Sequence, residues 1–216
     1  MTEHTENPLA SSDSIETAPA SDKPPEIPAP IDASPLAKGS LAMAALREIV
    51  ETVALFAVIF TVARFSIGNF IIVGQSMEPN YHQDQRLLVD RISPMLGWLQ
   101  RGDVVILHSP AEEIDLIKRL IGKPGDTIEL RDNRVYVNGE ALNEPYLPPN
   151  ADSGPKTGSA TWKLGPDEYF VMGDNRSASQ DSRFFGTAEY KYLIGRALLL
   201  YYPFSDFHVV QHYKYQ

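Results

Sequence analysis

The sequence predicts a mainly β domain that follows one apolar helix and an acidic N-terminal tail. Three observations lead to this prediction. Residues 1–40 are acidic and rich in proline, residues 41–69 contain the one long apolar segment, and residues 70–216 contain short apolar runs separated by glycine and proline. Short runs between turn residues are typical of strands. We therefore expect residues 70–216 to fold as one β-rich domain.

The N-terminal tail, residues 1–40, has a composition that does not support a folded core. It carries seven acidic and two basic residues, a net charge of −5 out of −9 for the chain, with seven of the 17 prolines and no aromatic residue. Such a segment buries too little apolar area to offset the entropy of ordering it, so we expect disorder. The tail is also too acidic, and too long before the apolar segment, to be a cleaved leader.

The apolar segment, residues 41–69, is expected to be a helix because it is rich in Ala, Leu, Ile, Val and Phe. Its uncharged centre, Thr52–Ala63, has 12 residues, which alone suits a buried core helix. The 19 residues from Ile49 to Ile67 are enough to cross a bilayer, with Glu51 near one end and Arg64 near the other. We expect a single transmembrane span, with a core helix as the alternative. Basic residues flank the segment on both sides, so the positive-inside rule does not orient it.

We expect eight strands after the helix, each a short run of aliphatic, β-branched or aromatic residues. Their expected bounds are Phe70–Val73, Arg86–Ile92, Asp103–Leu107, Leu116–Ile121, Thr127–Arg131, Arg134–Asn138, Tyr169–Met172 and Ala197–Tyr202. Residues 127–138 are expected to form a hairpin that turns at Asp132-Asn133. Residues 131–166 are expected to be a small variable excursion, because residues 143–166 are rich in Pro, Gly, Ser and Asn and predict a long loop.

Composition and motifs exclude several classes of site. The chain has no cysteine, which removes disulfides, thiolate catalysis and cysteine zinc sites. Its acidic balance argues against a nucleic-acid partner, which would need a basic face. The five histidines are scattered, and the chain has no phosphate loop and no dinucleotide-binding motif. We therefore expect neither a metal nor a cofactor.

Ser76 begins the tetrapeptide Ser76-Met77-Glu78-Pro79, which comes directly after the apolar segment. A serine in this place is either a loop residue or a nucleophile at a membrane surface, and a nucleophilic serine needs a base. His82 is six residues further along a turn, and no acid is arranged to orient it. A histidine-based triad is therefore not favoured.

Lys118 is the better candidate for a base. In the strand Leu116–Ile121, Lys118 shares a face with Leu116 and Leu120, while Arg119 shares the other face with Ile117 and Ile121. A lysine on an apolar face loses hydration, which lowers its pKa, whereas an arginine stays protonated. Lys118 is thus the one of the two adjacent cations that can accept a proton. The alternative is a lysine that extends to solvent from a strand edge.

Four blocks of the chain resemble one family, the bacterial type I signal peptidases, which are membrane-anchored Ser-Lys proteases. The blocks are VGQSMEP (73–79), DQRLLVDR (84–91), RGDVV (101–105) with IKRLIGKPGD (117–126), and GDNRSASQDSR (173–183). Together with the preceding helix, the resemblance covers most of Ile49–Pro203. It implies a mostly antiparallel β structure that needs no metal or cofactor.

The resemblance also implies a role for each matching residue. Ser76 would be the acylating nucleophile and Lys118 its general base, with Ser179 bound to the lysine amine. Supporting roles fall to an ion pair and to two residues that shape the same loop: Asp181 with Arg183, and Asp174 with Arg176. Apolar pockets for small side chains, as in an Ala-x-Ala site, would be lined by Phe70, Ile72, Met77 and Ile117.

One position departs from the family pattern. Well-known members carry a serine two residues before the nucleophile, where its hydroxyl joins the oxyanion hole, and this chain has Gly74. The oxyanion would then rest on the Ser76 backbone N–H and other backbone groups or water. A missing donor can cost about 3–4 kcal/mol of transition-state stabilisation.

The family resemblance further implies a location and partners. The chain would cross the plasma (inner) membrane once, with a cytoplasmic N-terminus and an extracytoplasmic catalytic domain. Its partners would be the signal peptides of exported preproteins, the lipid bilayer and the secretion machinery. Two alternatives remain at this point: a soluble Ser-Lys self-cleaving repressor-like peptidase, and an inactive membrane-anchored β domain that binds extended peptides.

Overall fold

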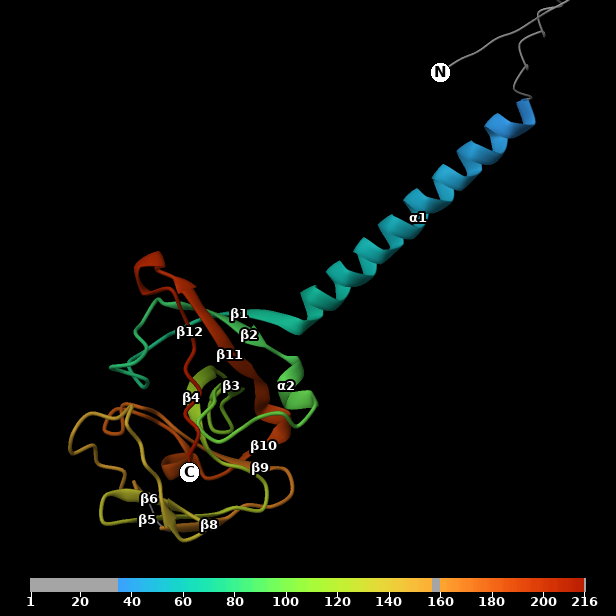
Figure 1. Cartoon of the computed structure of the whole chain (residues 1–216). Helices are drawn as coiled ribbons and strands as arrows, with labels where there is room; N and C mark the ends of the chain where they lie inside the picture. The colour runs from blue at the N-terminus through green and yellow to red at the C-terminus, as the bar shows by residue number, and fades with distance from the viewer. Residues whose placement is uncertain (1–34, 157–159, 216) are drawn as a thin grey trace, which may run out of the picture. The chain divides into compact units, whose positions relative to one another are not determined.

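The computed structural model describes residues 35–156 and 160–215, with side chains from Leu41 onward. In this part of the chain, helix α1 (Pro35–Ser66) precedes a domain of antiparallel strands (Figure 1). The predicted mainly β, antiparallel fold with one N-terminal apolar helix is confirmed. The tail predicted to be disordered was residues 1–40: residues 1–34 lie outside the described residues, while residues 35–40 belong to helix α1, so the prediction was wrong there.

Helix α1 contains an apolar stretch, Leu41–Ser66, of 26 residues. At about 1.5 Å per residue this stretch is about 39 Å long, enough for the ~30 Å hydrocarbon core of a bilayer. Within the described residues it is the one helix long and apolar enough to cross a membrane. The predicted boundaries were wrong at both ends. The helix begins at Pro35, and it ends at Ser66, whose hydroxyl donates to the Val62 carbonyl (2.6 Å).

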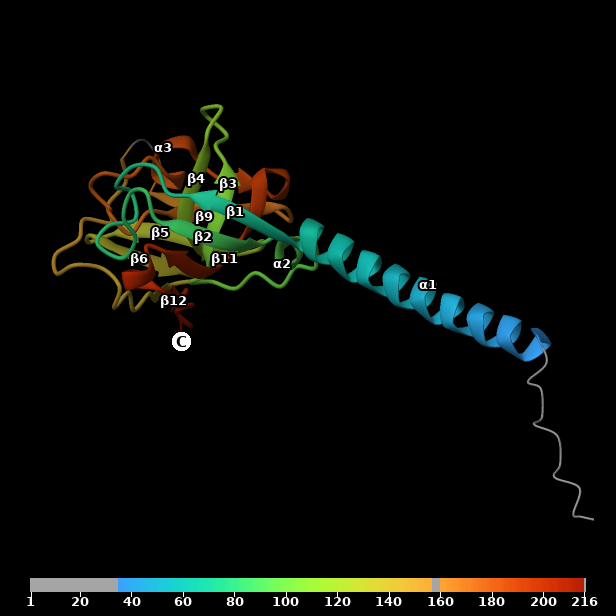
Figure 2. The same cartoon turned by 90° about the horizontal axis from the view of Figure 1, so that it is seen from above.

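The larger of the two sheets has eight strands in the described residues, and every pairing is antiparallel. The order is β1-β2-β11-β3-β4-β9-β10, with β12 paired to β11. Figure 2 shows β3, β4 and β9 side by side at its centre. The strands are β1 Ile67–Ile71, β2 Arg86–Asp90, β3 Val104–His108, β4 Asp115–Gly122, β9 Glu168–Met172, β10 Ala188–Glu189, β11 Leu193–Tyr202 and β12 His208–Val209.

The smaller sheet has four strands in the described residues, in the order β7-β6-β5-β8. Its strands are β5 Thr127–Arg131, β6 Arg134–Val137, β7 Glu140–Ala141 and β8 Thr161–Lys163. The predicted hairpin turn at Asp132-Asn133 has φ of 50° and 57° at its two residues, as a tight two-residue hairpin requires. The predicted excursion, residues 131–166, thus contributes three strands to a sheet, while residues 143–156 follow no regular structure.

Several expected strand bounds were also wrong. Strand β1 begins at Ile67, directly after the helix, and ends at Ile71, because it pairs with all of β2. Strand β11 begins at Leu193, because its first half pairs with β3 and its second half with β2. The sequence did not predict the short helices α2 (Ile92–Met95), α3 (Ser182–Phe185), η1 (Tyr190–Tyr192) and η2 (Phe204–Asp206).

Strand β4 is buried on both faces, as its sequence predicted. Leu116 and Leu120 contact one apolar cluster, while Ile117 and Ile121 belong to two others. A strand between two packed layers has no solvated face, so its charged side chains must find partners inside the protein.

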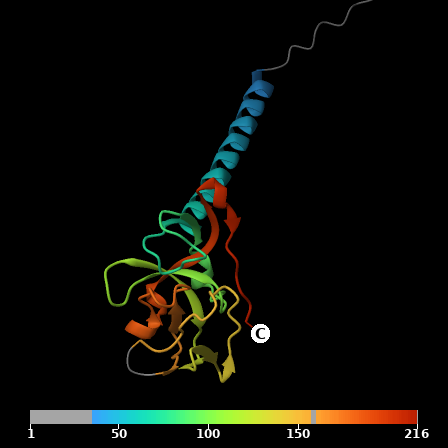
Figure 3. The same cartoon turned by 90° about the vertical axis from the view of Figure 1, so that its left-hand side faces the viewer.

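The C-terminal segment after β12, residues 210–215, runs along the domain (Figure 3). It passes over Gly102, which has φ of 91°, and a Cβ at Gly102 would lie 1.8 Å from the Tyr213 carbonyl oxygen. Only glycine permits this approach. The segment is held by the contact of the Tyr215 and Tyr146 hydroxyls at 2.6 Å and by the contact of the His212 Nδ1 with the Asp103 carboxylate at 2.8 Å.

Candidate active site

The loop that carries Ser76 follows β1 and is attached to the segment after β9. The Asn175 backbone N–H donates to the Ser76 carbonyl (3.0 Å), and the Asn175 side chain donates to the Gln75 carbonyl (3.1 Å). Gly173 makes this close approach possible. A Cβ at Gly173 would lie 2.4 Å from the Ser76 carbonyl oxygen and 2.3 Å from the Ser179 hydroxyl.

Lys118 extends from β4 and meets this loop. Its Nζ donates to the Ser76 Oγ at 2.8 Å and to the Ile117 carbonyl at 2.9 Å. Within the described residues, no carboxylate lies within ion-pair distance of the amine. Lys118 is 2% exposed. Burial lowers its pKa from 10.5 to about 8, against the opposing charges of Asp181 and Asp174. The two predicted catalytic residues therefore lie in contact.

Asp181 and Arg183 form a buried ion pair beneath the Ser76 loop. Two nitrogens of Arg183 donate to the two carboxylate oxygens of Asp181, each at 2.9 Å. The Gly173 backbone N–H donates to the same carboxylate at 3.0 Å. Burial raises the pKa of Asp181, but the hydrogen bonds and charge of Arg183 outweigh burial and lower it. Asp181 thus stays ionised and holds Gly173 in place.

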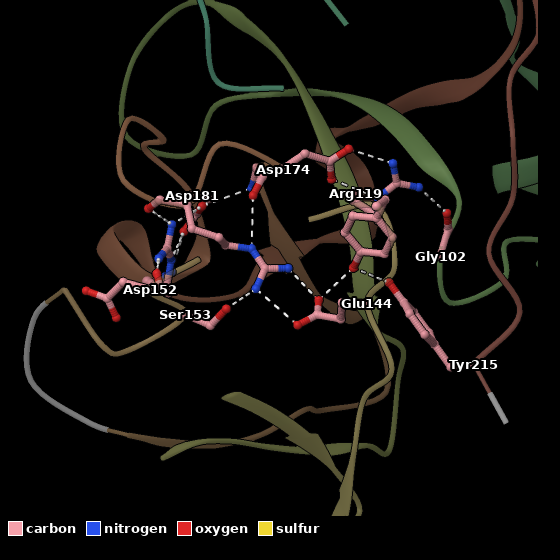
Figure 4. Close-up of polar contacts among 12 residues, drawn as sticks. Gly102, Arg119, Glu144, Asp152, Ser153, Asp174, Asp181 and Tyr215 are labelled. Carbon is pink, nitrogen blue, oxygen red and sulfur yellow. Dashed lines mark hydrogen bonds and ion pairs between the residues drawn. The ribbon is translucent and has the colours of Figure 1, made fainter. Parts of the chain in front are cut away.

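Asp174 pairs with Arg119, a partner that the sequence did not assign. Arg119 donates to both carboxylate oxygens of Asp174, at 2.8 and 2.6 Å, and to the Gly102 carbonyl at 2.9 Å (Figure 4). The Tyr146 ring lies 4.0 Å from the Arg119 guanidinium. Asn80, from the Ser76 loop, donates to Asp174 at 2.8 Å. Asp174 therefore joins the nucleophile loop to β4.

Arg176 pairs with Glu144 and not with Asp174. It donates to both carboxylate oxygens of Glu144, to the Ser153 hydroxyl, and to the Gly173 carbonyl at 3.1 Å. Figure 4 shows Glu144 and Ser153 close together in this network. Glu144 and Ser153 lie in the irregular part of the excursion, where no periodic pattern could have indicated a buried partner. Neither residue lies in the blocks that resemble the family, and only the fold joins their segment to residues 173–183.

Ser179 does not make the hydrogen bond that the family resemblance implied. Ser179 is 9% exposed, and its hydroxyl has no hydrogen-bond partner in the described part of the chain. The amine of Lys118 is instead directed to Ser76 and Ile117. The Ser179 hydroxyl lies against Gly173, near the Asp181 carboxylate. It makes a small contribution to the lowered pKa of Asp181.

The four residues assigned to apolar pockets lie together in one cluster. Ile72, Met77 and Ile117 are 1%, 1% and 2% exposed, and Phe70 packs against them half-buried. Three of the four side chains are therefore covered by their neighbours in this structure. They form the packed base of the nucleophile loop, and Phe70 alone keeps a partly open surface.

Gly74 has a backbone conformation that explains its identity. Its φ is 86°, and no atom lies within 4 Å of the place where a Cβ would stand. Space would therefore allow a serine here, but the positive φ favours glycine. Two residues later, the Ser76 backbone N–H has no acceptor within the described chain, so it is free to bind a ligand oxygen.

The described side chains include no group of three or more His, Asp or Glu residues placed to hold a metal ion. The site is made of a hydroxyl, an amine, a free backbone N–H and two buried carboxylate–arginine pairs below them. A hydroxyl beside an amine of lowered pKa is an arrangement that supports nucleophilic attack.

Known proteins match this chain over most of the described domain. The family model for signal peptidase, peptidase S26, matches residues 46–202. Signal peptidase I T of Bacillus subtilis (strain 168) is 38% identical over 152 residues, which are 67% of this chain and 79% of that protein. Signal peptidase IB of Staphylococcus aureus (strain N315) is 32% identical over 176 residues, 75% of this chain and 92% of that protein.

A crystal structure of a signal peptidase I from Enterococcus faecalis V583 is 34% identical, with a TM-score of 0.39, and covers 45% of this chain and 95% of that chain. The family model spans more than half of the chain, and the relatives exceed 30% identity over two thirds of it. The chain therefore belongs to the signal peptidase family, peptidase S26, and is a serine endopeptidase.

Proposed function

We propose that this protein removes N-terminal signal peptides from secreted preproteins, with Ser76 as nucleophile and Lys118 as general base. One observation carries the proposal: the Lys118 amine lies 2.8 Å from the Ser76 hydroxyl, in a buried place that lowers its pKa to about 8. An amine of that pKa is neutral in about one fifth of the molecules near pH 7.4, far more than an ordinary lysine, so the basic form is accessible. Membership of the signal peptidase family supports the substrate class.

The first half of the reaction forms an ester. Neutral Lys118 takes the proton of the Ser76 hydroxyl as its oxygen attacks the carbonyl carbon before the scissile bond. In the neutral amine, the Ile117 carbonyl can still accept an N–H, and the bond to Ser76 then reverses, so that the Ser76 hydroxyl donates to the nitrogen lone pair. The lysinium then donates its proton to the leaving amine, the peptide bond breaks, and the signal peptide stays bound to Ser76 as an ester.

The second half releases the signal peptide. Lys118, neutral again, takes a proton from a water molecule, whose oxygen attacks the ester carbonyl. The lysinium returns the proton to the Ser76 oxygen as the ester bond breaks, so the enzyme is restored. Each proton that leaves a nucleophile thus passes through one amine.

The negative charge on the substrate oxygen needs a donor, and the Ser76 backbone N–H fills this role. This N–H has no acceptor in the described chain, and it belongs to the attacking residue, so it lies beside the reacting carbon. Gly74 supplies no hydroxyl. Its open surroundings leave room for water or for the substrate backbone.

The preferred site has the Ala-x-Ala pattern, with small side chains at the first and third positions before the cut. The cluster of Phe70, Ile72, Met77 and Ile117 is packed closely under the Ser76 loop. Ile72, Met77 and Ile117 are covered in this structure, so the close packing of this cluster leaves no depth for a long substrate side chain. Phe70 is the residue most able to contact substrate, because it is only half-buried.

Supporting roles follow from the ion pairs. Asp181 with Arg183 holds Gly173 against the Ser76 carbonyl. Asp174 with Arg119, and Arg176 with Glu144, hold the rest of the same loop.

Helix α1 is proposed to be the single span of the plasma (inner) membrane. The N-terminus, residues 1–40, then lies in the cytoplasm, and the catalytic domain, residues 70–216, lies outside it. The bilayer and the secretion machinery, which delivers the preproteins, are the partners of this arrangement. The exposure of every large apolar side chain from Leu41 to Phe65 supports a lipid surrounding.

The two alternative functions have less support. A self-cleaving repressor would need a DNA-binding domain, whereas the match is to signal peptidases. An inactive peptide-binding domain would not require a buried lysine in contact with a serine hydroxyl, an arrangement that costs folding energy.

Cleavage of a preprotein by the full chain in detergent tests the proposal. Ser76→Ala and Lys118→Met should each abolish cleavage while the thermal unfolding transition is retained. The matched controls are Ser205→Ala and Lys191→Met, because both side chains are exposed. Residual cleavage at the wild-type rate by either site variant would refute the assignment. A penem that acylates the wild type but not Ser76→Ala identifies the nucleophile directly.

A further inference from the structure

The loop that follows β2, residues 91–98, exposes an unusual amount of apolar surface. Met95 is 73% exposed, Leu96 51% and Trp98 60%. We call residues 91–98 the α2 loop, because it contains helix α2. Single exposed apolar residues are common on proteins, but adjacent large ones in one loop mark a contact with another molecule or with lipid.

The α2 loop is a built structure that holds these side chains outward. The Asp90 carboxylate accepts from the Ile92 and Ser93 backbone N–H groups at 2.8 and 3.1 Å, and from the Ser93 hydroxyl. The Trp98 N–H donates to the Ser93 carbonyl at 2.9 Å. Ser93 and Pro94 are buried beneath the loop. These contacts fix both ends of the loop and leave the side chains of Met95, Leu96 and Trp98 exposed.

The α2 loop begins beside the end of helix α1. The first residue of β1, Ile67, pairs with Asp90, and the Arg91 backbone N–H donates to the Ser66 carbonyl at 2.9 Å. Ser66 is the last residue of the helix. The Arg91 guanidinium lies over Gly68, where a Cβ would be 2.8 Å from its Nε. The loop is therefore joined by hydrogen bonds to the place where the proposed span ends.

We propose that the α2 loop is a second membrane contact, which inserts Met95, Leu96 and Trp98 into the boundary between headgroups and acyl chains. This inference rests on the membrane anchoring proposed above. Tryptophan is enriched at this boundary, because its ring is apolar while its N–H seeks water or headgroup oxygens. Arg91, whose backbone N–H bonds the last residue of the helix, begins the loop where a cation can meet anionic headgroups.

Lipid is favoured over a protein partner because the loop is attached to the end of helix α1. If the helix spans the bilayer, the loop therefore lies near the membrane surface. A single span leaves the domain free to rotate about the helix axis, whereas a second contact beside the helix end restricts that rotation. The apolar tip would otherwise remain in water at a short distance from the bilayer, where burying it is favourable.

The chain contains two tryptophans, Trp98 and Trp162, which gives a matched pair of reporters. Trp162 lies in the small sheet, where its ring packs 4.8 Å from the Phe170 ring. Trp162→Phe leaves Trp98 as the reporter, and Trp98→Phe leaves Trp162. Each full-length variant is placed in phosphatidylcholine–phosphatidylglycerol vesicles, with and without brominated acyl chains. Trp98 fluorescence should be quenched several-fold more than Trp162 fluorescence.

Carbonate extraction of the same vesicles separates the two proposals. If the chain resists extraction and Trp98 is quenched no more than Trp162, the α2 loop contact is refuted while the anchoring stands. If carbonate releases the chain, the anchoring fails and the inference fails with it. These vesicles contain no other protein, so a loop that binds a protein partner instead of lipid would also leave Trp98 unquenched.

A second measurement does not depend on tryptophan. Leu96→Asp should lower preprotein processing in vesicles several-fold and leave cleavage of a short soluble peptide in detergent unchanged. Asp115→Asn, at the exposed first residue of β4, is the control and should change neither rate. Equal loss in both assays would show a folding defect instead and would count against the membrane contact.

Discussion

Lys118 and Arg119 are adjacent on β4, equally buried, and surrounded in opposite ways. They are 2% and 1% exposed. Arg119 lies between Asp174 and the Gly102 carbonyl, with tyrosine rings over it. Lys118 contacts a hydroxyl and a carbonyl. One cation has a carboxylate that neutralises it, and the other has none in contact.

The difference in partners determines the charge of each side chain. Burial alone lowers the pKa of both cations. The hydrogen bonds and charge of Asp174 outweigh burial at Arg119 and raise its pKa above its ordinary value. Lys118 lacks such a partner, and its pKa falls to about 8. Burial without a counterion thus produces a base, while burial with one produces a structural cross-link.

Lys118→Arg should have the largest effect, because it places a second permanent cation at the site. An arginine cannot accept the Ser76 proton, so kcat/KM for preprotein cleavage should fall by about 10²–10⁴-fold or more. Lys191→Arg, at an exposed ion pair with Glu189, is the matched control and should keep wild-type activity. Cleavage by the Lys118→Arg variant at a comparable rate would mean that Lys118 supplies charge and not a base.

Asp174→Asn should leave Arg119 as a buried cation without a carboxylate partner, which is the situation of Lys118 in the wild type. The free energy of unfolding should fall by about 3–5 kcal/mol, measured by denaturant titration in detergent. Glu189→Gln, which breaks an exposed pair, should cost less than about 1 kcal/mol. If Asp174→Asn lowers the free energy of unfolding by as little as Glu189→Gln does, the Arg119–Asp174 pair is not important for stability.

Lys118→Met should stabilise the protein near pH 7, because it removes a desolvated amine. The folded-state pKa of about 8 lies below the ordinary 10.5. Between these values the unfolded chain binds the extra proton, so wild-type stability rises with pH through that window and is lowest below about pH 8. The variant should gain about 1–3 kcal/mol at pH 7.

The same Lys118→Met variant should also lose the part of the pH slope that this lysine contributes. Lys191→Met should leave the slope intact. A wild-type stability that does not rise between pH 8 and 10.5, relative to Lys118→Met, would contradict the lowered pKa.

Asp181→Asn should have the smallest effect, a shift in the pH profile of activity. Wild-type cleavage should rise with pH through about 8, because the neutral amine is the active form. The charge of Asp181 raises the pKa of Lys118, so its removal should move the rise to lower pH. The midpoint of the rise is the measure, with each rate divided by the folded fraction at that pH, because the variant also breaks the buried Asp181–Arg183 pair. A shift to higher pH would contradict this account.

The chemistry of the site could be predicted from sequence because its residue types are restrictive. A serine nucleophile needs a base, and Lys118 stood between Leu116 and Leu120 on a strand with no polar face. The hairpin at Asp132-Asn133 was equally local, because a two-residue turn depends on those two residues. Local chemistry was sufficient for the hairpin, whereas for Lys118 it left a solvent-extended lysine as the alternative, and the family resemblance selected Lys118 as the base.

The partners of the arginines could not be predicted, because tertiary structure alone brings them together. Asp174 lies 55 positions from Arg119, and Glu144 lies 32 positions from Arg176, in a segment without periodicity. The predicted Ser179 hydrogen bond failed for a related reason. The Lys118 amine bonds whichever nearby oxygens are closest, here those of Ser76 and Ile117, and a sequence does not give those distances.

The direct connection between α1 and β1 has one more consequence. Ten positions separate Ser66, at the end of the helix, from Ser76, and an extended chain of that length reaches at most about 35 Å. Five of these residues are fixed in β1 by pairing with β2. With the helix in a bilayer, the length of this segment limits how far above the membrane Ser76 can lie, and so where a peptide bond is cut. Two residues added to β1 would preserve its alternation of faces and raise the cutting plane by about 7 Å.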